Sequence, residues 1–242
     1  MPQPHFVHYI PIATTIFALG FAYALFKRYH ERRSGPHLLW WGAGVLLYGA
    51  GTFAESWVTL FGWNEAIFRS WYITGALLGG APLAQGTVYL IFPRHTATRM
   101  AWALMLAVAV AATFVLLTPI NTTLVESYRL SGKVMAWQWV RLFSPFINTY
   151  AFIFLVGGAV ASAIHYRKHT ETYHRFIGNV FIAVGALLPG IGGSFTRMGY
   201  VEVLYVTEFI GLTLIYTGYR FNIRKSKPLS ETVPAEDKAY AG

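Results

Sequence analysis

The chain has 242 residues, of which 55% are hydrophobic and only 12% are charged, and its formal net charge is +9. A soluble protein needs about a quarter of its residues charged to cover its surface, so the composition excludes an ordinary soluble fold and predicts an integral membrane protein. Cysteine is absent, which excludes disulfides, thiolate nucleophiles and cysteine-ligated metal sites. Because Lys and Arg fall in short segments between apolar runs, we expect the lipid bilayer, and no nucleic acid, as the partner.

Seven apolar runs reach the length of about 18 residues that a helix needs to cross a bilayer. The predicted fold class is therefore all-α, a polytopic membrane protein with seven transmembrane helices. We expect residues 1–225 to form this domain and residues 226–242 to form a disordered cytoplasmic tail. In chain order, the predicted spans cover residues 9–26, 38–61, 67–92, 101–120, 142–164, 176–196 and 201–219.

Positive charge is divided unevenly between the two sides of the predicted bundle. The segments after the first, third, fifth and seventh spans hold 14 of the 19 Lys and Arg residues. The positive-inside rule then places the N-terminus outside and the C-terminus in the cytoplasm, in a plasma (inner) membrane. The stretch Met1–His5 lacks the basic region of a signal peptide, so we expect the first span to be retained.

The one long connection, residues 121–141, is predicted to lie outside. Two β-compatible stretches around Ser131 and Gly132 predict a hairpin. Trp137 and Trp139 equally suit a segment at the lipid headgroups. A lid over a pocket and a loop lying on the membrane are both compatible with this composition.

Three short motifs occur twice, in the same order and in spans that run in the same direction. They predict two parallel three-helix units joined by the fourth span. Gly and Leu are common in membrane helices, so chance recurrence is the alternative. The matches are residues 44–51 with 185–192, residues 16–20 with 153–157, and residues 72–74 with 205–207.

A duplicated layout of this kind is topologically similar to the three-plus-one-plus-three sugar transporters of the SWEET type. The adjacent proline–glutamine signature of related small transporters is missing, since Pro82 and Gln85 lie three residues apart. Seven spans with an outside N-terminus also resemble the rhodopsin plan. The seventh span, residues 201–219, contains no lysine for a Schiff base, which excludes a covalent retinal chromophore.

Ionisable residues inside a bilayer are functional candidates because each costs about 2.5–3.5 kcal/mol to insert. Glu208 is the first candidate, since it is the deepest carboxylate and has no cation near it in sequence, and Glu55 is the second. The alternative at the outer boundary is simple pairing, of Glu55 with Arg69 and of Arg197 with Glu202. The predicted ligand-binding residues are Glu55, Arg69, Trp71, Tyr72, Gln85, Arg197, Glu202 and Glu208.

Two predicted spans contain unusual concentrations of small residues. These are residues 75–82 in the third span and residues 185–193, with Pro189, in the sixth. Close packing of helices is the ordinary explanation. Interrupted helices around a binding site, as transporters use, are the alternative.

Six of the eight histidines fall on the predicted cytoplasmic side. His165 and His169 are four residues apart and share a helix face, so these two and His174 are the candidates for a metal or haem site. No carboxylate is embedded among them, and the only aspartate, Asp237, lies in the tail. We therefore predict neither a metal site nor catalytic residues, and no motif identifies a cofactor.

The sequence favours binding or transport of a small molecule through an outward-facing cavity between the second, third, sixth and seventh spans. It does not separate a carrier from a sensor. The alternative is a non-catalytic accessory subunit of a larger membrane complex, or a homo-oligomer, whose aromatic surface contacts other helices, pigment or lipid. A membrane enzyme that uses the cytoplasmic histidines is the third hypothesis, and we lean against it.

Overall fold

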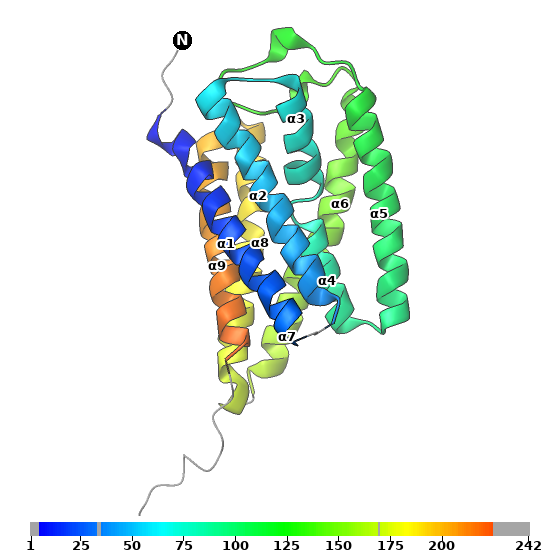
Figure 1. Ribbon diagram of the computed structural model, residues 1–242, viewed down its shortest axis with the longest axis vertical. Coiled ribbons are helices and arrows are strands. Elements are labelled where there is room, and N and C mark those ends of the chain that lie inside the picture. The colour runs from blue at the N-terminus through cyan, green and yellow to red at the C-terminus, as the bar shows by residue number, and fades with distance from the viewer. Residues whose placement is uncertain (1–4, 33–34, 169, 225–242) are drawn as a thin grey trace, which may run out of the picture.

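The computed structural model is all-α, as the composition predicted (Figure 1). It describes residues 5–32, 35–168 and 170–224, so the predicted tail over residues 226–242 lies outside the described residues. Within the described ranges the chain folds into seven helices, two of which contain a π-helical segment.

Five helices are long and apolar enough to cross a membrane by length and composition, which makes the chain a multi-pass membrane protein in contact with the lipid bilayer. Each is at least 18 residues long and carries few charges over its central stretch. These five are Phe6–Arg32, Arg94–Leu117, Gln138–Tyr166, Tyr173–Thr196 and Val201–Asn222.

The N-terminal 3₁₀ turn Phe6–Tyr9 leads into α1, Ile10–Arg32, which packs along α2, His37–Phe61. Although α2 has 25 residues, it is not among the five apolar spans. It contacts α1 on one side and α3 and α4 on another, and many of its buried residues are Gly, Thr or Ser. The remaining face of α2 is apolar and exposed, with Leu46, Phe53 and Leu60.

The predicted third span, residues 67–92, is broken. It consists of α3, Glu65–Trp71, a π-helical segment, Tyr72–Leu77, and α4, Ala81–Ile91. At the break the Gly79 N–H donates to the Gly75 carbonyl, and a Cβ placed on Gly79 would lie 2.5 Å from that oxygen. The chain follows this path only because position 79 has no side chain, so the glycines here interrupt a helix.

The remaining helices complete the bundle. α5, Arg94–Leu117, stands at the edge opposite α8 and α9 (Figure 1). The fifth helix is continuous but contains a π-helical stretch between α6 and α7. The bounds of the last elements are Phe143–Ala151 for α6, Phe152–Gly157 for the π-helical stretch, Gly158–Tyr166 for α7, Tyr173–Arg197 for α8 and Val201–Asn222 for α9.

Glycines let α8 and α9 approach one another closely along their length. A Cβ on Gly185 would lie 2.6 Å from the Gly211 carbonyl oxygen, and a Cβ on Gly211 would lie 2.7 Å from the Gly185 carbonyl oxygen. Pro189 lies inside α8 without ending it. In the sixth span the small residues therefore serve helix packing. The glycines of α8 that face α9 are spaced seven residues apart: Gly178, Gly185 and Gly192.

The long connection between α5 and α6 covers one end of the bundle, which we call the loop end; the opposite end, with most of the Lys and Arg residues, is the basic end (Figure 1). The predicted hairpin is wrong, because the described chain contains only two isolated β-bridges here and Gly132 begins a 3₁₀ turn. Val134 and Met135 are buried against the bundle, whereas Trp137 and Trp139 are exposed. The loop thus packs on the helices and also presents tryptophans outward.

Candidate functional site

The two carboxylates that the sequence ranked highest, Glu55 and Glu208, meet inside the bundle. Glu55 lies six residues before the end of α2 at Phe61, and Glu208 lies seven residues after the start of α9 at Val201. Since an α-helix rises about 1.5 Å per residue, both acids lie roughly 10 Å from the ends of their helices at the loop end. Their carboxyl groups lie within hydrogen-bonding reach of one another. Helices distant in sequence therefore bring two acids to one point.

Only part of this carboxyl pair is satisfied by the protein. The indole N–H of Trp71 donates to Glu55 Oε1 over 3.0 Å. Within the described part of the chain, Glu55 Oε2 and Glu208 Oε2 are shielded from solvent and accept no hydrogen bond. Glu55 is only 3% exposed; Glu208 is partly exposed as a residue, but this oxygen is not. Such atoms are rare in folded proteins.

Aromatic side chains surround the pair. The Tyr48 hydroxyl donates to the backbone carbonyl of Glu208 over 3.1 Å, which ties α2 to α9 at this height. Tyr205 is buried and lies close enough to both carboxyl groups to interact with them electrostatically. Together with Trp71, these residues place apolar ring surfaces around the pair, and their only side-chain polar groups are the Tyr hydroxyls and the Trp N–H.

A second group of residues covers the site toward the loop end. The Tyr205 hydroxyl donates to the Tyr128 carbonyl over 3.3 Å. The buried His8 ring meets the rings of Tyr128 and Tyr205 edge to face, with centroids 5.9 and 6.0 Å apart. Tyr128 has φ +60°, in the left-handed region where a bulky residue is strained. The N-terminal turn and the long loop therefore both close over this point.

Arg69 does not reach Glu55 as the pairing alternative proposed. Its guanidinium pairs with Glu65 at 2.6 Å, and it also donates to the carbonyls of Val115 and Thr118. Those carbonyls belong to the last turn of α5 and its C-cap, where unpaired acceptors and the helix dipole attract a cation. Arg69 therefore fastens α3 to α5.

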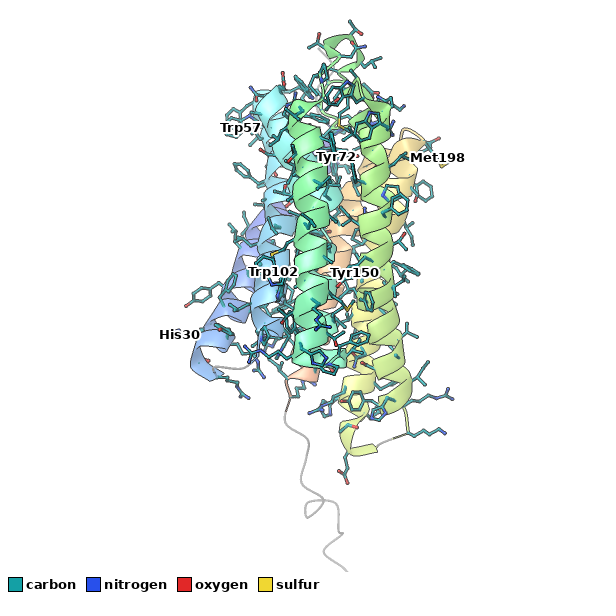
Figure 2. All side chains as sticks on the ribbon, turned by 90° about the vertical axis from the view of Figure 1, so that its right-hand side faces the viewer. His30, Trp57, Tyr72, Trp102, Tyr150 and Met198 are labelled. Atoms are coloured by element: carbon teal, nitrogen blue, oxygen red, sulfur yellow. The ribbon has the colours of Figure 1, made fainter. Side chains whose placement is uncertain are left out.

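Tyr72 and Gln85, also predicted in the site, make contacts elsewhere. Tyr72 is buried, packs against Phe68 and Trp71, and lies under the loop near Gly132. Gln85 is fully buried. Figure 2 shows Tyr72 near the loop end, well above Tyr150, which is the partner of Gln85.

Both polar atoms of the Gln85 amide are hydrogen-bonded at a junction of three helices. Its Nε2 donates to the Ala97 carbonyl over 2.9 Å, and its Oε1 accepts from the Tyr150 hydroxyl. These bonds join α4 to α5 and α6. Gln85 therefore holds the helices together in the half of the bundle nearer the basic end.

Of the two predicted residues that flank the α8–α9 connection, Glu202 and Arg197, the structure describes only the side chain of Glu202. Glu202 lies in the first turn of α9, close enough to Tyr205 for electrostatic interaction. The Arg197 side chain lies outside what the structure describes, so its pairing with Glu202 stays a prediction. Arg129, which also lies near Tyr205, pairs with Glu126 at 2.7 Å and donates to the Thr196 carbonyl.

The ion pairs of the described residues leave the carboxyl pair without a cation. They join Lys27 to Glu31, Arg69 to Glu65 and Arg129 to Glu126. Each of these cations is therefore matched by an acid other than Glu55 and Glu208.

The histidines form no cluster with metal-site character in the part of the chain that is described. No group of three or more His, Cys, Asp or Glu side chains there could hold a metal ion. His165 is exposed near the end of α7, His174 lies in the first turn of α8, and His169 falls outside the described residues.

Sequence reasoning missed Tyr48 and Tyr205, although helical spacing held a signal for both. Tyr48 precedes Glu55 by seven residues and Tyr205 precedes Glu208 by three, so each tyrosine shares a helix face with its acid. His8 and Tyr128 had no such signal, because they come from a turn and a loop.

A comparison of the chain with protein-family models, curated proteins and solved structures finds no match.

Proposed function

We propose that this membrane protein binds a small molecule at the Glu55–Glu208 pair, in an outward-facing site that His8, Tyr128 and Tyr205 cover at the loop end, and that it acts as a carrier or a sensor. The observation that supports this most is the presence of two shielded carboxyl oxygens without a partner in the described chain. An intramembrane acid with an unpartnered oxygen is expensive to keep, and ionisable residues inside membranes commonly serve ligands, ions or protons.

The proposal includes the full threading of the chain. Seven spans cross the membrane when α2 and the broken α3–α4 helix are counted with the five long apolar helices. The loop end then lies outside and the basic end in the cytoplasm, because positive residues gather on the cytoplasmic side. The positive residues of the described helix ends on that side are Lys27, Arg28, Arg32, Arg94, Arg99, Arg167, Lys168, Arg175, Arg220 and Arg224.

Equivalent glycine contacts support the proposal that the bundle is a parallel repeat. In the sequence matches, Gly51 corresponds to Gly192, and Thr74 corresponds to Thr207. A Cβ on Gly51 would touch the backbone of residues 74 and 75, and a Cβ on Gly192 would touch the Thr207 hydroxyl. Spans two and three therefore meet at the same motif positions as spans six and seven, which chance recurrence of Gly and Leu does not require.

The broken third span provides a position near the site at which α3 can change its orientation relative to α4. Trp71, which bonds Glu55, is the last residue of α3 and directly precedes the π-helical segment. Short π-helical segments and glycine breaks occur often at functional sites and in transporter helices. A ligand that repositions Trp71 would change how α3 meets α4, which serves a carrier and a sensor equally.

A second candidate function, an accessory subunit of a larger complex, is supported by α5. Only 22% of its apolar window is buried in the bundle, the smallest share among the five long spans. Trp102 on this helix is 68% exposed (Figure 2). Another membrane protein or lipid can cover this face.

The test uses the full chain, extracted gently and purified in detergent. We expect native mass spectrometry to show a bound small molecule, and a panel of cationic, neutral and anionic compounds to contain some that raise the melting temperature. Glu55→Gln and Glu208→Gln should abolish this stabilisation, whereas Glu31→Gln, an exposed acid at the basic end, should preserve it. If no compound of any charge stabilises the wild type and a fixed set of other chains co-purifies, the subunit function is correct instead.

A further inference from the structure

The charge balance of the Glu55–Glu208 pair identifies the class of ligand, given the proposed function above. Two carboxylates in contact and away from water cannot both stay ionised, so the empty site holds one shared proton. One negative charge remains. The described cations of neighbouring elements, Arg69 and Arg129, are already paired with Glu65 and Glu126. The missing complement is therefore a single positive charge.

We infer that the ligand is a protonated amine, whose ammonium group takes the place of the shared proton between Glu55 and Glu208. An ammonium group carries three hydrogen-bond donors. Glu55 Oε2 and Glu208 Oε2 accept from no other group of the described structure, so both are shielded acceptors once the shared proton has left. They belong to carboxyl groups within reach of one another. Two of the three donors can thus be satisfied at once.

The groups around the pair favour an organic cation over a metal ion. Hard metal cations require about six oxygen ligands or more. Here the Trp71 N–H, a donor, faces Glu55, and the backbone carbonyl of Glu208 already accepts from Tyr48. The aromatic residues Trp71, Tyr48 and Tyr205 also lie near the pair, and such rings attract ammonium groups.

Binding of the amine then releases one proton. The empty pair carries one negative charge and the amine one positive charge; the occupied pair carries two negative charges against one positive charge, and one proton leaves to water. No covalent bond forms and no electron is transferred. The new ammonium hydrogen bonds stabilise the second carboxylate, which is why the proton departs.

Several other titratable or charged groups face this region and must be separated from the pair. On α2 and α9 they are Tyr48, Tyr205 and Glu202. On the covering turn and loop they are His8 and Arg129. Of these, His8 is the imidazole, and an imidazole ordinarily titrates near neutral pH, so it requires its own control.

The experiment compares amines with alcohols of the same shape on the purified full chain. Phenethylamine with 2-phenylethanol, and hexylamine with hexanol, differ mainly in charge. Titration calorimetry in two buffers of different ionisation enthalpy counts the protons released. We expect the amines to bind at least about tenfold more tightly than their alcohols, to release about one proton, and to gain about tenfold in affinity for each unit rise in pH between about 6 and 8.

Variants assign the proton to the pair. Glu55→Gln and Glu208→Gln, each nearly isosteric, should abolish proton release, and the melting temperature of each variant reports whether it is folded. His8→Gln should leave proton release intact. Loss of proton release in His8→Gln, together with its persistence in Glu208→Gln, would assign the proton to the imidazole and overturn the inference.

The outcomes separate this inference from the proposed function. Alcohols that bind as tightly as amines, or amines that bind without releasing a proton, would overturn the ligand class and leave small-molecule binding at the pair standing. Failure of every compound in the cationic, neutral and anionic panel would overturn the proposed function itself.

Discussion

Two glycine-rich segments of similar composition adopt opposite structures in this protein. Residues 75–82 interrupt the third span, whereas residues 185–193 lie inside the continuous helix α8 even though they include Pro189. In the first segment the tight contact is within the chain, between Gly79 and the Gly75 carbonyl; in the second it is between helices, from Gly185 to the Gly211 carbonyl.

What each glycine contacts, rather than glycine content, therefore decides whether the helix continues. Gly185 and Gly192, seven residues apart, return to the same face of α8 and both meet α9, whereas the Cβ positions of Gly190 and Gly193 have nothing within 4 Å. At Gly79 the chain instead folds against its own Gly75 carbonyl, a position that a Cβ would block. The π-helical segment, Tyr72–Leu77, separates this break from Trp71, whose indole N–H donates to Glu55.

The largest expected effect comes from filling a glycine contact between α8 and α9. Gly185→Ala should lower the free energy of unfolding by about 2 kcal/mol, because the new methyl group must push away the Gly211 carbonyl. Gly190→Ala is the matched control on the same helix, since no described atom lies within 4 Å of its Cβ position. Alanine there should be neutral or stabilise by up to about 1 kcal/mol. Thermal melts in a mild detergent measure both, and equal melting temperatures would contradict the packing account.

The second effect concerns how α4 is held beyond the break. The Trp41 indole N–H donates to the Leu83 carbonyl over 3.1 Å. Trp41→Phe should cost about 1 kcal/mol of stability through loss of this hydrogen bond, and hydrogen exchange should increase first in α4. Trp102→Phe, on the lipid-facing surface of α5, is the control and should change neither quantity. Faster exchange spread evenly over all helices would argue against a locally held α4.

These two segments also show what the sequence could predict. Long apolar runs were sufficient to predict the all-α fold, because a helix that crosses a bilayer needs a length and a hydropathy that can be read directly from the sequence. The break after Leu77 was one of two open alternatives, since it depends on which neighbour each glycine meets. Composition alone treated residues 75–82 and 185–193 alike.

The candidate site divides in the same way. Glu55 and Glu208 stood out because an acid inside an apolar run is anomalous wherever the helix packs. The partner of Arg69 could not be ranked in the same manner: Glu65, four residues away on the same helix, competes with Glu55, and the structure gives the closer acid. Contacts such as Tyr205 with Tyr128 depend on loop geometry that no periodicity encodes.

A smaller effect is expected when the proline of each glycine-rich segment is replaced by alanine. Pro189→Ala restores an N–H toward the Gly185 carbonyl but removes ring atoms that pack against Gly211, so we expect a net change below about 1 kcal/mol. Pro82→Ala, in the first turn of α4 where an N–H needs no partner, should change stability by less than about 0.5 kcal/mol. Melting temperatures measure both. If Pro82→Ala made the third span continuous, Pro82 rather than Gly79 would be the cause of the break. The hydrogen-exchange pattern of the π-helical segment would then differ from that of the wild type.

The smallest effect is a pH dependence at the start of α2, just before the predicted span. Burial, and then the nearby positive charge of Arg28, lowers the pKa of His37 below its ordinary value of 6.5. The folded state therefore prefers the neutral ring, so its contribution to stability is present above pH 6.5 and is lost as the pH falls toward the lower folded value. The His37 ring packs edge-on against Trp41 at 5.3 Å, so acid should loosen the contact that holds α4. We expect the melting temperature to fall slightly more between pH 7 and 5 in the wild type than in His37→Gln, with His30→Gln, an exposed histidine on α1, behaving like the wild type. An identical slope in His37→Gln would remove His37 from this role and leave the Trp41 hydrogen bond as the tie between α2 and α4.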